Sequence, residues 1–222
     1  MTTNDLFLLS PELSLAGLAF VLLLLDLVVP RKGVLAAVGV LGLALPLAFS
    51  VSLWLNGNVV PEDSVLADTL VVDKFSLFFK FLFIGVAATV ILVSIEYVKR
   101  IHRFQIEYYA LVMFSTTGMM LLASTVELIT IYISLELTAL PLVALAAFLR
   151  NSRSSESGMK FLVLSGISSA LLLYGMVMVY GFTGSTMLKD VAARLAGMGL
   201  SADQPFGAGS YALLFGIVLM IA

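Results

Sequence analysis

The chain has 222 residues, of which 61% are hydrophobic and 12% charged, and its mean hydropathy is +1.11. A soluble domain has about 45–50% apolar and about 25% charged residues, so this composition excludes an ordinary soluble domain. The net charge of −2, the single histidine and the absence of cysteine give no support for nucleic-acid binding, disulfides, an iron–sulfur cluster or a histidine-based metal site.

Six complete apolar segments recur along the chain, and about 20 apolar residues suffice for a helix to cross a membrane. The expected spans are about residues 13–29, 33–55, 75–97, 108–123, 128–149 and 159–180, and a seventh begins at about residue 211. The runs are continuous rather than alternating, which favours helices over a barrel. The N-terminus lacks the positive start of a signal peptide, so the first span is expected to stay in the membrane. We predict an all-α polytopic membrane protein.

The segment after the sixth span has a different pattern. Its sequence, STMLKDVAARLAG, places Met187, Val191 and Leu195 four residues apart. This spacing predicts a short amphipathic helix at the membrane interface, about residues 186–196. The last apolar run reaches Ala222 with no polar residue after it, so we expect the chain to be part of a longer protein, with a truncated seventh helix.

Positive residues gather in alternate loops. Arg and Lys follow the first, third and fifth spans, at residues 31–32, 99–103 and 150–153, whereas the loops between them are acidic or nearly uncharged. Cytoplasmic loops carry the excess of Lys and Arg. We therefore expect the N-terminus on the outer side of the membrane.

The fifth span, YISLELTALPLVALAAFLR, carries one carboxylate, Glu136, near the middle of the membrane. An ionisable group at that depth costs about 2.5–3.5 kcal/mol on insertion scales and is a functional-site hypothesis by default. Pro141 removes a helix hydrogen bond and frees the carbonyl of Leu137 beside it. We expect Glu136 to change charge with its surroundings, as a proton relay requires; the alternative is a structural glutamate bound to a neighbouring helix.

Lys160 is the second candidate. It follows the polar segment RNSRSSESG, where a serine is expected to cap the sixth helix and Lys160 to lie about one turn in, at the cytoplasmic side. The residues alone favour a lysine that snorkels to the headgroups. A direct salt bridge to Glu136 is less expected than a link through water, because the two residues lie at different depths.

Other polar residues in the spans receive structural interpretations. Lys80 is expected to snorkel towards Asp73 or the outer headgroups, and Glu12 to be interfacial. The groups STTG, residues 115–118, and SGISS, residues 165–169, are expected to pack helices closely. No phosphate-binding loop, metal cluster or nucleophile–base pair occurs in the sequence, so the chain carries no redox chemistry of its own.

The runs SLEL…LPL…LAAF and KF…LSG…SALLLYGM…YG.TGS occur together and in this order. They resemble subunit N of respiratory complex I, the NADH–quinone oxidoreductase, from about Asp73 to Ser185. The resemblance implies an antiporter-like, proton-translocating subunit of about 14 helices with inverted repeats. Residues 1–125 would form four N-terminal helices, and residues 126–222 would begin the proton-translocating domain.

The resemblance also implies site residues and partners. Glu136 matches the fifth-helix glutamate of the family and Lys160 a lysine of the sixth helix, which favours a relay role for Lys160. The family's seventh-helix lysine, the main partner of the glutamate, would lie beyond Ala222. Quinone, FMN and iron–sulfur clusters would belong to partner subunits of the complex, and this chain would contact membrane-arm subunits, lipids, water and protons. A bacterial inner membrane is the expected location.

Two alternatives stay open. A subunit of a multisubunit sodium/proton antiporter has a similar fold, but its fifth helix usually carries an aromatic residue next to the glutamate, where this chain has Leu135 and Leu137. A scaffold subunit that transports nothing is the other alternative, and it predicts that Glu136 is dispensable once the complex has assembled.

Overall fold

The computed structural model describes residues 3–28, 32–56, 69–101, 105–197 and 210–221. Nearly all of these residues are helical, and the only extended pairings among them are two isolated bridges, so the predicted all-α architecture is confirmed. The helices are α1 (Thr3–Leu8), α2 (Ser10–Val28), α3 (Lys32–Gly42), α4 (Ala44–Asn56), α5 (Lys74–Ile101), α6 (Gln105–Leu122), α7 (Leu128–Ala146), α8 (Ser152–Thr183), α9 (Leu188–Gly197) and α10 (Ser210–Ile221).

Each expected span corresponds to a helix or, for the second span, to the successive helices α3 and α4. Within the described ranges, five segments are long and apolar enough to cross a membrane: α2, residues 37–55, α5, α7 and α8. The remaining expected span is α6, whose hydropathy is reduced by Gln105, Glu107 and its hydroxyl-bearing residues. α6 packs against α2, α5 and α7, and many of its side chains are buried, which explains how a less apolar helix fits in the centre of the bundle.

The start of α8 differs from the sequence-based expectation in its position and in the residue that caps it. α8 begins at Ser152, so most of the segment expected to be a polar loop is helical. Asn151, not a serine, caps this helix, and its Oδ1 accepts a 2.7 Å hydrogen bond from the N–H of Ser154. The prediction failed here because Asn and Ser cap helices about equally well. Lys160 consequently lies two turns into α8.

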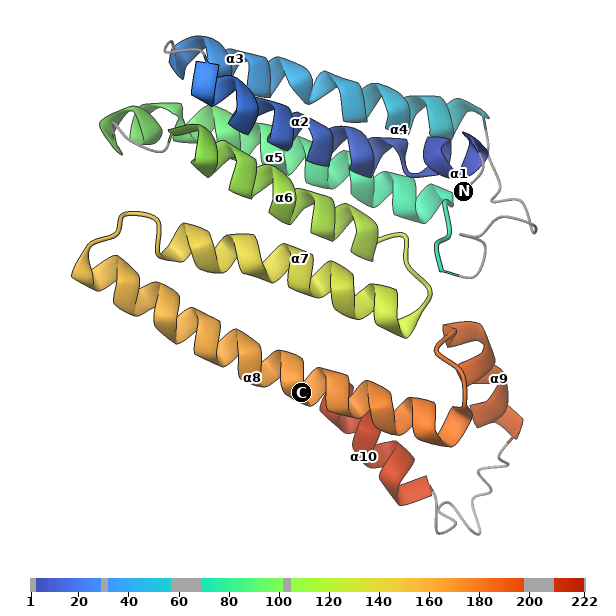
Figure 1. The fold of residues 1–222 in the computed structure, drawn as a ribbon. Coiled ribbons are helices and arrows are strands. Elements are labelled where there is room, and N and C mark those ends of the chain that lie inside the picture. The colour runs from blue at the N-terminus through green and yellow to red at the C-terminus, as the bar shows by residue number, and fades with distance from the viewer. Residues whose placement is uncertain (1–2, 29–31, 57–68, 102–104, 198–209, 222) are drawn as a thin grey trace.

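The helices form two connected groups (Figure 1). α2 to α6 pack together around a core that includes Leu15, Leu22, Ile91 and Met113. α7 packs on α6, α8 on α7, and α10 on α8. A second cluster, with Leu128 and Met176 among its members, joins α7, α8, α9 and α10. α7 therefore lies between the N-terminal bundle and α8.

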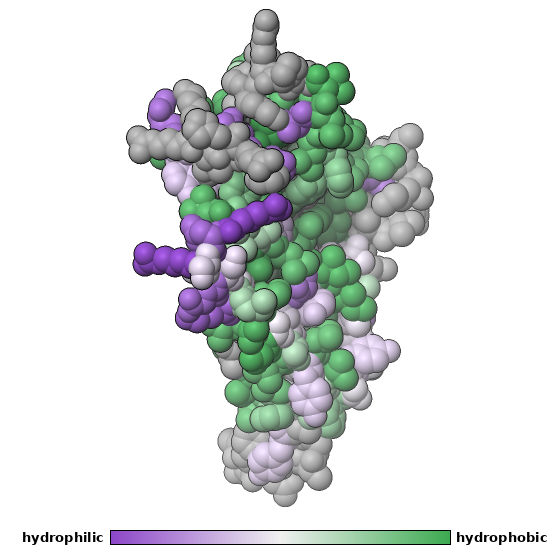
Figure 2. All heavy atoms as spheres, turned by 60° about the vertical axis from the view of Figure 1, so that its left-hand side comes forward, coloured by the Kyte–Doolittle hydropathy of each residue, from purple (hydrophilic) through white to green (hydrophobic). Residues whose placement is uncertain are grey.

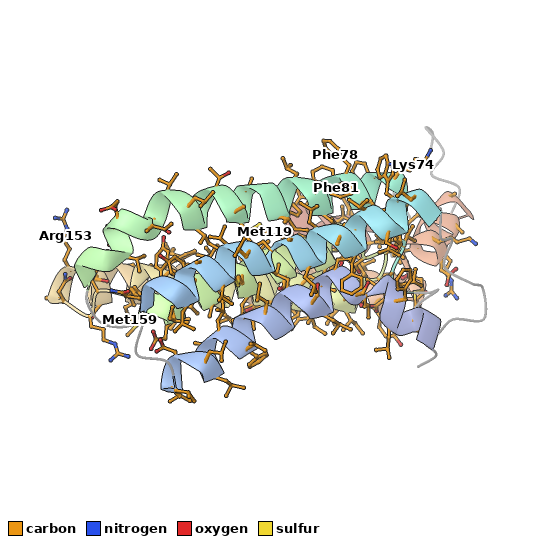
Figure 3. All side chains as sticks on the ribbon, turned by 90° about the horizontal axis from the view of Figure 1, so that it is seen from above. Lys74, Phe78, Phe81, Met119, Arg153 and Met159 are labelled. Atoms are coloured by element: carbon orange, nitrogen blue, oxygen red, sulfur yellow. The ribbon has the colours of Figure 1, made fainter. Side chains whose placement is uncertain are left out.

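The surface agrees with a membrane protein. Large apolar side chains are exposed along α2, α5, α7 and α8, and Figure 2 shows hydrophobic residues over much of one face, with hydrophilic residues gathered in a limited area. Lys74 and Arg153 lie at opposite ends of the bundle (Figure 3). We call the end with Lys74 the outer end and the end with Arg153 the inner end.

Three connecting segments meet at the outer end. The N–H of Val71 donates to the carbonyl of Ser124 at 2.7 Å, and the N–H of Val126 donates to the carbonyl of Thr69 at 3.0 Å. The N–H of Leu128 donates to the carbonyl of Thr186 at 2.9 Å, beside the bridge between Glu127 and Met187. These bonds satisfy backbone groups that the helices leave unpaired at their ends.

α9 corresponds to the expected amphipathic helix. Val191 is its buried residue and Leu195 packs on the same cluster, whereas Lys189 and Asp190 are exposed. The Oγ of Ser185 accepts a hydrogen bond from the N–H of Met187 at 3.2 Å and donates to Asp190 at 3.0 Å. The predicted apolar face of this segment is therefore the face that packs on α7, α8 and α10.

Candidate functional site

α7 begins at a buried carboxylate. Glu127 caps the start of this helix: one of its carboxylate oxygens accepts 2.7 Å hydrogen bonds from both the N–H and the hydroxyl of Thr130. Burial raises the pKa of the Glu127 carboxyl, but the hydrogen bonds from Thr130 and Thr186 outweigh this effect, and the net pKa lies below its usual value. The start of α7 is thus held by a carboxylate that is ionised at neutral pH.

Glu136 lies near the middle of α7, eight residues after Leu128 and ten before Ala146. At about 1.5 Å per residue, these positions are roughly 12 and 15 Å away along the axis. Its side chain is half-buried, and its Oε1 accepts a short hydrogen bond from the hydroxyl of Ser169 on α8. The carboxylate is therefore held between two membrane helices at mid-depth.

Ser169 was not identified as a partner of Glu136 from the sequence. The SGISS group was visible as a cluster of small polar residues, but its expected role was helix packing. Serine hydroxyls in membrane helices also bond to their own backbone, as Ser134 does to the carbonyl of Thr130 at 2.7 Å. Only the position of Ser169 opposite Glu136 across the α7–α8 contact distinguishes the two roles.

The turn of α7 that follows Glu136 contacts α6 closely. A Cβ atom added to Gly118 would meet the backbone nitrogen of Thr138 at 2.6 Å. The hydroxyl of Ser115 donates to the carbonyl of Thr138 at 3.1 Å. α7 continues through the buried Pro141 without interruption. The expected role of the STTG group in close packing is therefore confirmed, and α6 fixes the backbone of α7 on the side away from α8.

Lys160 and Glu136 are not in contact. The Nζ of Lys160 lies 2.6 Å from Oε1 of Glu156, one turn earlier on α8, and both side chains are exposed. Lys160 precedes Ser169 by nine residues, which is roughly 13 Å along the helix. The structure thus places Lys160 in an exposed ion pair towards the inner end and leaves its role as a relay a prediction.

The interpretation of Lys80 was wrong. Lys80 does not extend to Asp73 or to the headgroups: its Nζ lies 2.7 Å from Oε1 of Glu12, and both side chains are buried. Oδ1 of Asp73 instead accepts a 2.7 Å hydrogen bond from the N–H of Ser76. The prediction failed because Glu12 and Lys80 lie on helices that come together only in the folded bundle.

The polar groups gathered at this site are a carboxylate and hydroxyls. In the described part of the chain, no three His, Asp or Glu residues are arranged to hold a metal ion. Glu136 has a hydroxyl donor, Ser169, on a neighbouring helix, and an ionisable side chain inside a membrane helix is a functional-site hypothesis by default. The geometry suits transfer of a proton within the membrane.

Comparison with known proteins agrees with this geometry. Residues 124–222 match the family described as "NADH:quinone oxidoreductase/Mrp antiporter, TM". The chain is 37% identical to NADH-quinone oxidoreductase subunit N of Dehalococcoides mccartyi over 98% of its own length and 45% of that protein. It is 40% identical to subunit N 1 of Koribacter versatilis over 88% of its length and 40% of that protein.

A solved structure supports the same relationship. A chain of respiratory complex I from Thermus thermophilus with bound aureothin is 29% identical, with a TM-score of 0.66, and the match covers 95% of this chain and 49% of that one. This chain therefore spans somewhat less than half the length of the curated relatives above. The resemblance inferred from its sequence is confirmed: the chain is similar to the antiporter-like membrane subunits of NADH:quinone oxidoreductase, and to subunit N in particular.

Proposed function

We propose that this chain forms the N-terminal part of a membrane-arm subunit that translocates protons, driven by electron transfer to quinone in other subunits of the complex. The observation that carries the proposal is Glu136, a carboxylate held by Ser169 between α7 and α8 at mid-depth. Residues 1–125 form the N-terminal helices, and residues 126–222 begin the transporting domain, in agreement with the match that starts at Ser124.

Glu136 is the charge-changing group of this proposal. A proton on Glu136 neutralises the carboxylate, and loss of that proton restores an anion that attracts positive charge from neighbouring helices. Lys160 lies on the same helix as Ser169, towards the inner end, and serves as a relay through water. Its exposed pair with Glu156 leaves it accessible to the aqueous phase on that side.

The proposal includes partners and orientation. The subunit assembles with other membrane-arm subunits, and quinone, FMN and iron–sulfur clusters belong to partner subunits. The exposed Arg150, Arg153 and Lys160 lie towards the inner end, which supports a cytoplasmic position for that end and an N-terminus on the outer side of a bacterial inner membrane.

The test uses the complete enzyme in inverted membrane vesicles. Glu136→Gln keeps the size of the side chain and removes its charge. We expect normal assembly and a severe loss of proton uptake driven by NADH oxidation. Asp190→Asn is the matched control, because Asp190 is an exposed carboxylate on α9, and it should pump as the unmodified enzyme does. Normal pumping by assembled Glu136→Gln enzyme would contradict the role of Glu136 and favour a scaffold.

A sodium/proton antiporter remains the second candidate because the matched family includes the Mrp antiporters. Copurification distinguishes the two assignments. Flavin and iron–sulfur subunits in the purified complex support the oxidoreductase, whereas their absence together with sodium-dependent proton exchange would support the antiporter.

A further inference from the structure

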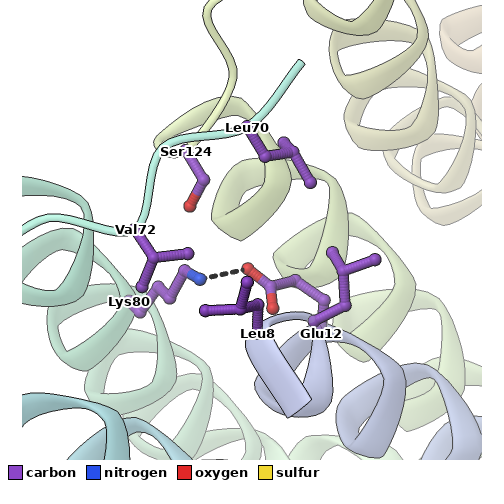
Figure 4. A pocket seen from close by; sticks show the side chains of 7 residues that line it. Leu8, Glu12, Leu70, Val72, Lys80 and Ser124 are labelled. Carbon is purple, nitrogen blue, oxygen red and sulfur yellow. Dashed lines mark ion pairs between the residues drawn. The ribbon is translucent and has the colours of Figure 1, made fainter. Parts of the chain in front are cut away.

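A buried pair of charges lies at the outer end of the bundle, on helices other than the one that carries Glu136. Glu12 belongs to the first turn of α2, and Lys80 lies two turns into α5. Their charged atoms are 2.7 Å apart, and the side chains of Lys80 and Glu12 are only 1% and 3% exposed. Figure 4 shows the two side chains meeting between the helices. Both residues precede residue 124, where the match to the family described as "NADH:quinone oxidoreductase/Mrp antiporter, TM" begins.

The carboxylate of Glu12 is incompletely satisfied. Its Oε1 faces Lys80, but its Oε2 is buried and accepts no hydrogen bond from the described residues. Buried polar atoms almost always have a partner, so an orphaned carboxylate oxygen requires an explanation. Its free lone pairs suit it to accept a hydrogen bond from water or a proton.

A small cavity adjoins this pair. Its volume is about 10 Å³, and Leu8, Leu9, Leu70 and Val72 form its apolar walls. Its polar lining consists of Glu12, Lys80 and Ser124 (Figure 4). A volume of about 10–15 Å³ on this measure is enough for one water, which needs two to four polar partners. The cavity therefore has the size and the partners that a single water requires.

Ser124 is suited to hold such a water. Its hydroxyl lies 3.5 Å from the carbonyl of Met120, which is a weak hydrogen bond. Ser124 also lies in the segment that joins α6 to α7 at the outer end. A water beside it is therefore close to the outer ends of the helices, and the path to the aqueous phase is short.

The other acidic side chains near the outer end have partners of their own and do not line the cavity. Asp73 and Glu127 accept 2.7 Å hydrogen bonds from Ser76 and Thr130, respectively. Asp5 on α1 is buried and has an interaction of its own. Among the residues that line the cavity, Glu12 and Lys80 are the charged ones.

We propose that Glu12, Lys80 and Ser124 form a proton-binding site that exchanges with the outer aqueous phase through one water. The water donates a proton to Oε2 of Glu12 and receives another from the aqueous phase. Glu12 becomes a neutral carboxyl group while Lys80 stays an ammonium, so the site gains one positive charge. Return of the proton through the same water restores the ion pair.

Infrared difference spectroscopy of the complete complex tests this site after a change of pH in the outer phase. We expect the C=O band of one protonated carboxyl group, which is lost in Glu12→Gln and retained in Glu136→Gln. A band retained in assembled Glu12→Gln enzyme would overturn the proposal. Because the readout is a carboxyl band rather than pumping, this result is independent of the role proposed for Glu136.

Two milder variants keep the test decisive if Glu12→Gln fails to assemble. Ser124→Ala removes one partner of the water, and Val72→Ile adds a methylene group to the cavity wall, and both leave the ion pair in place. We expect exchange of the carboxyl proton for deuterium to slow several-fold in both variants. Exchange at the unmodified rate in both would show that the cavity water carries no proton and would refute the site.

Discussion

At the scale of single residues, the hydrogen bond between Glu136 and Ser169 joins the candidate site to α8. Hydrogen bonds to charged groups contribute about 1.5–3 kcal/mol. Loss of this donor therefore removes a polar contact of the Glu136 carboxyl group without changing Glu136 itself. Ser168 offers a matched comparison, because it is an exposed serine one position earlier on the same helix.

Ser169→Ala is expected to slow NADH-driven proton uptake about tenfold or more, in keeping with the contribution of one charge-assisted hydrogen bond. Ser168→Ala should retain the unmodified rate. The measurement is proton uptake in inverted vesicles, normalised to the amount of assembled complex. Equal rates for the two variants would argue that the bond from Ser169 has no part in transport.

The sequence identified some residues of the site and missed others. Glu136 was evident because a carboxylate is costly in an apolar helix, and that signal is local. The pairing of Glu12 with Lys80 was missed because it requires α2 and α5 to be placed side by side. The same limit hid Ser169, since the alternative partners of a serine hydroxyl look identical in sequence.

At the scale of elements, the α6–α7 contact depends on the absence of a side chain at Gly118. In Gly118→Ala, the new Cβ would lie 2.6 Å from the backbone nitrogen of Thr138, and a backbone neighbour cannot turn away. We expect α6 and α7 to separate slightly and the protein to lose about 1–3 kcal/mol of stability, as in overpacked cores.

Thermal unfolding of the purified protein in detergent measures this loss as a lower Tm. Gly85→Ala on α5 is the control, because nothing lies within 4 Å of its added Cβ. Alanine is the better helix former by about 0.5–1 kcal/mol, so the control should be as stable as the unmodified protein or slightly more so. A similar Tm for both variants would refute close α6–α7 packing at this glycine.

The start of α7 gives the stability a dependence on pH. The folded protein lowers the pKa of Glu127 below its usual value of 4.5, because hydrogen bonds from Thr130 outweigh burial. Glu127 thus stabilises the fold fully above about pH 4.5, and its contribution is lost as the pH falls through the lower folded pKa. Glu127→Gln should flatten this part of the curve of Tm against pH. An unchanged slope in the variant would assign the acid sensitivity to other carboxylates.

The sequence predicted which segments are helical better than it predicted where each helix begins and ends. Each apolar run in the sequence corresponds to one or two helices of the structure, since the membrane requires long apolar runs. It placed the start of α8 too late, because helical residues that extend into water are as polar as a loop. Arg153 and Glu156 are examples, because they are exposed residues in the first two turns of α8.

At the scale of the whole molecule, the orientation follows from which charges lie at which end. Lys74 and Arg153 lie at opposite ends and are exposed. The sequence contains no cysteine, so a single introduced thiol in this chain reports one position. We expect an impermeant thiol reagent applied outside intact cells to label Lys74→Cys and to leave Arg153→Cys unlabelled.

Mass spectrometry of the isolated subunit measures the labelling, and opened membranes should make both positions reactive. Labelling of Arg153→Cys alone in intact cells would reverse the predicted orientation. The sequence sufficed for this prediction because loop charge governs membrane topology. The sequence could not show which helices pack against α7 and α8, because several apolar helices offer equivalent surfaces. The exposed apolar side chains of these two helices include Ile133, Leu140 and Leu164.

The contacts at the two ends of α7 and α8 also restrict how these helices move. At the outer end, the backbones of Leu128 and Thr186 are bonded, and at the inner end a short turn is tied by the bond from Ser154 to the carbonyl of Ala146. The two helices form a frame closed at both ends, so neither slides along the other. Between these ends the helices are joined at mid-length, where Glu136 meets Ser169. A displacement of one helix relative to the other would therefore act on the hydrogen bond from Ser169 that holds the half-buried carboxylate of Glu136.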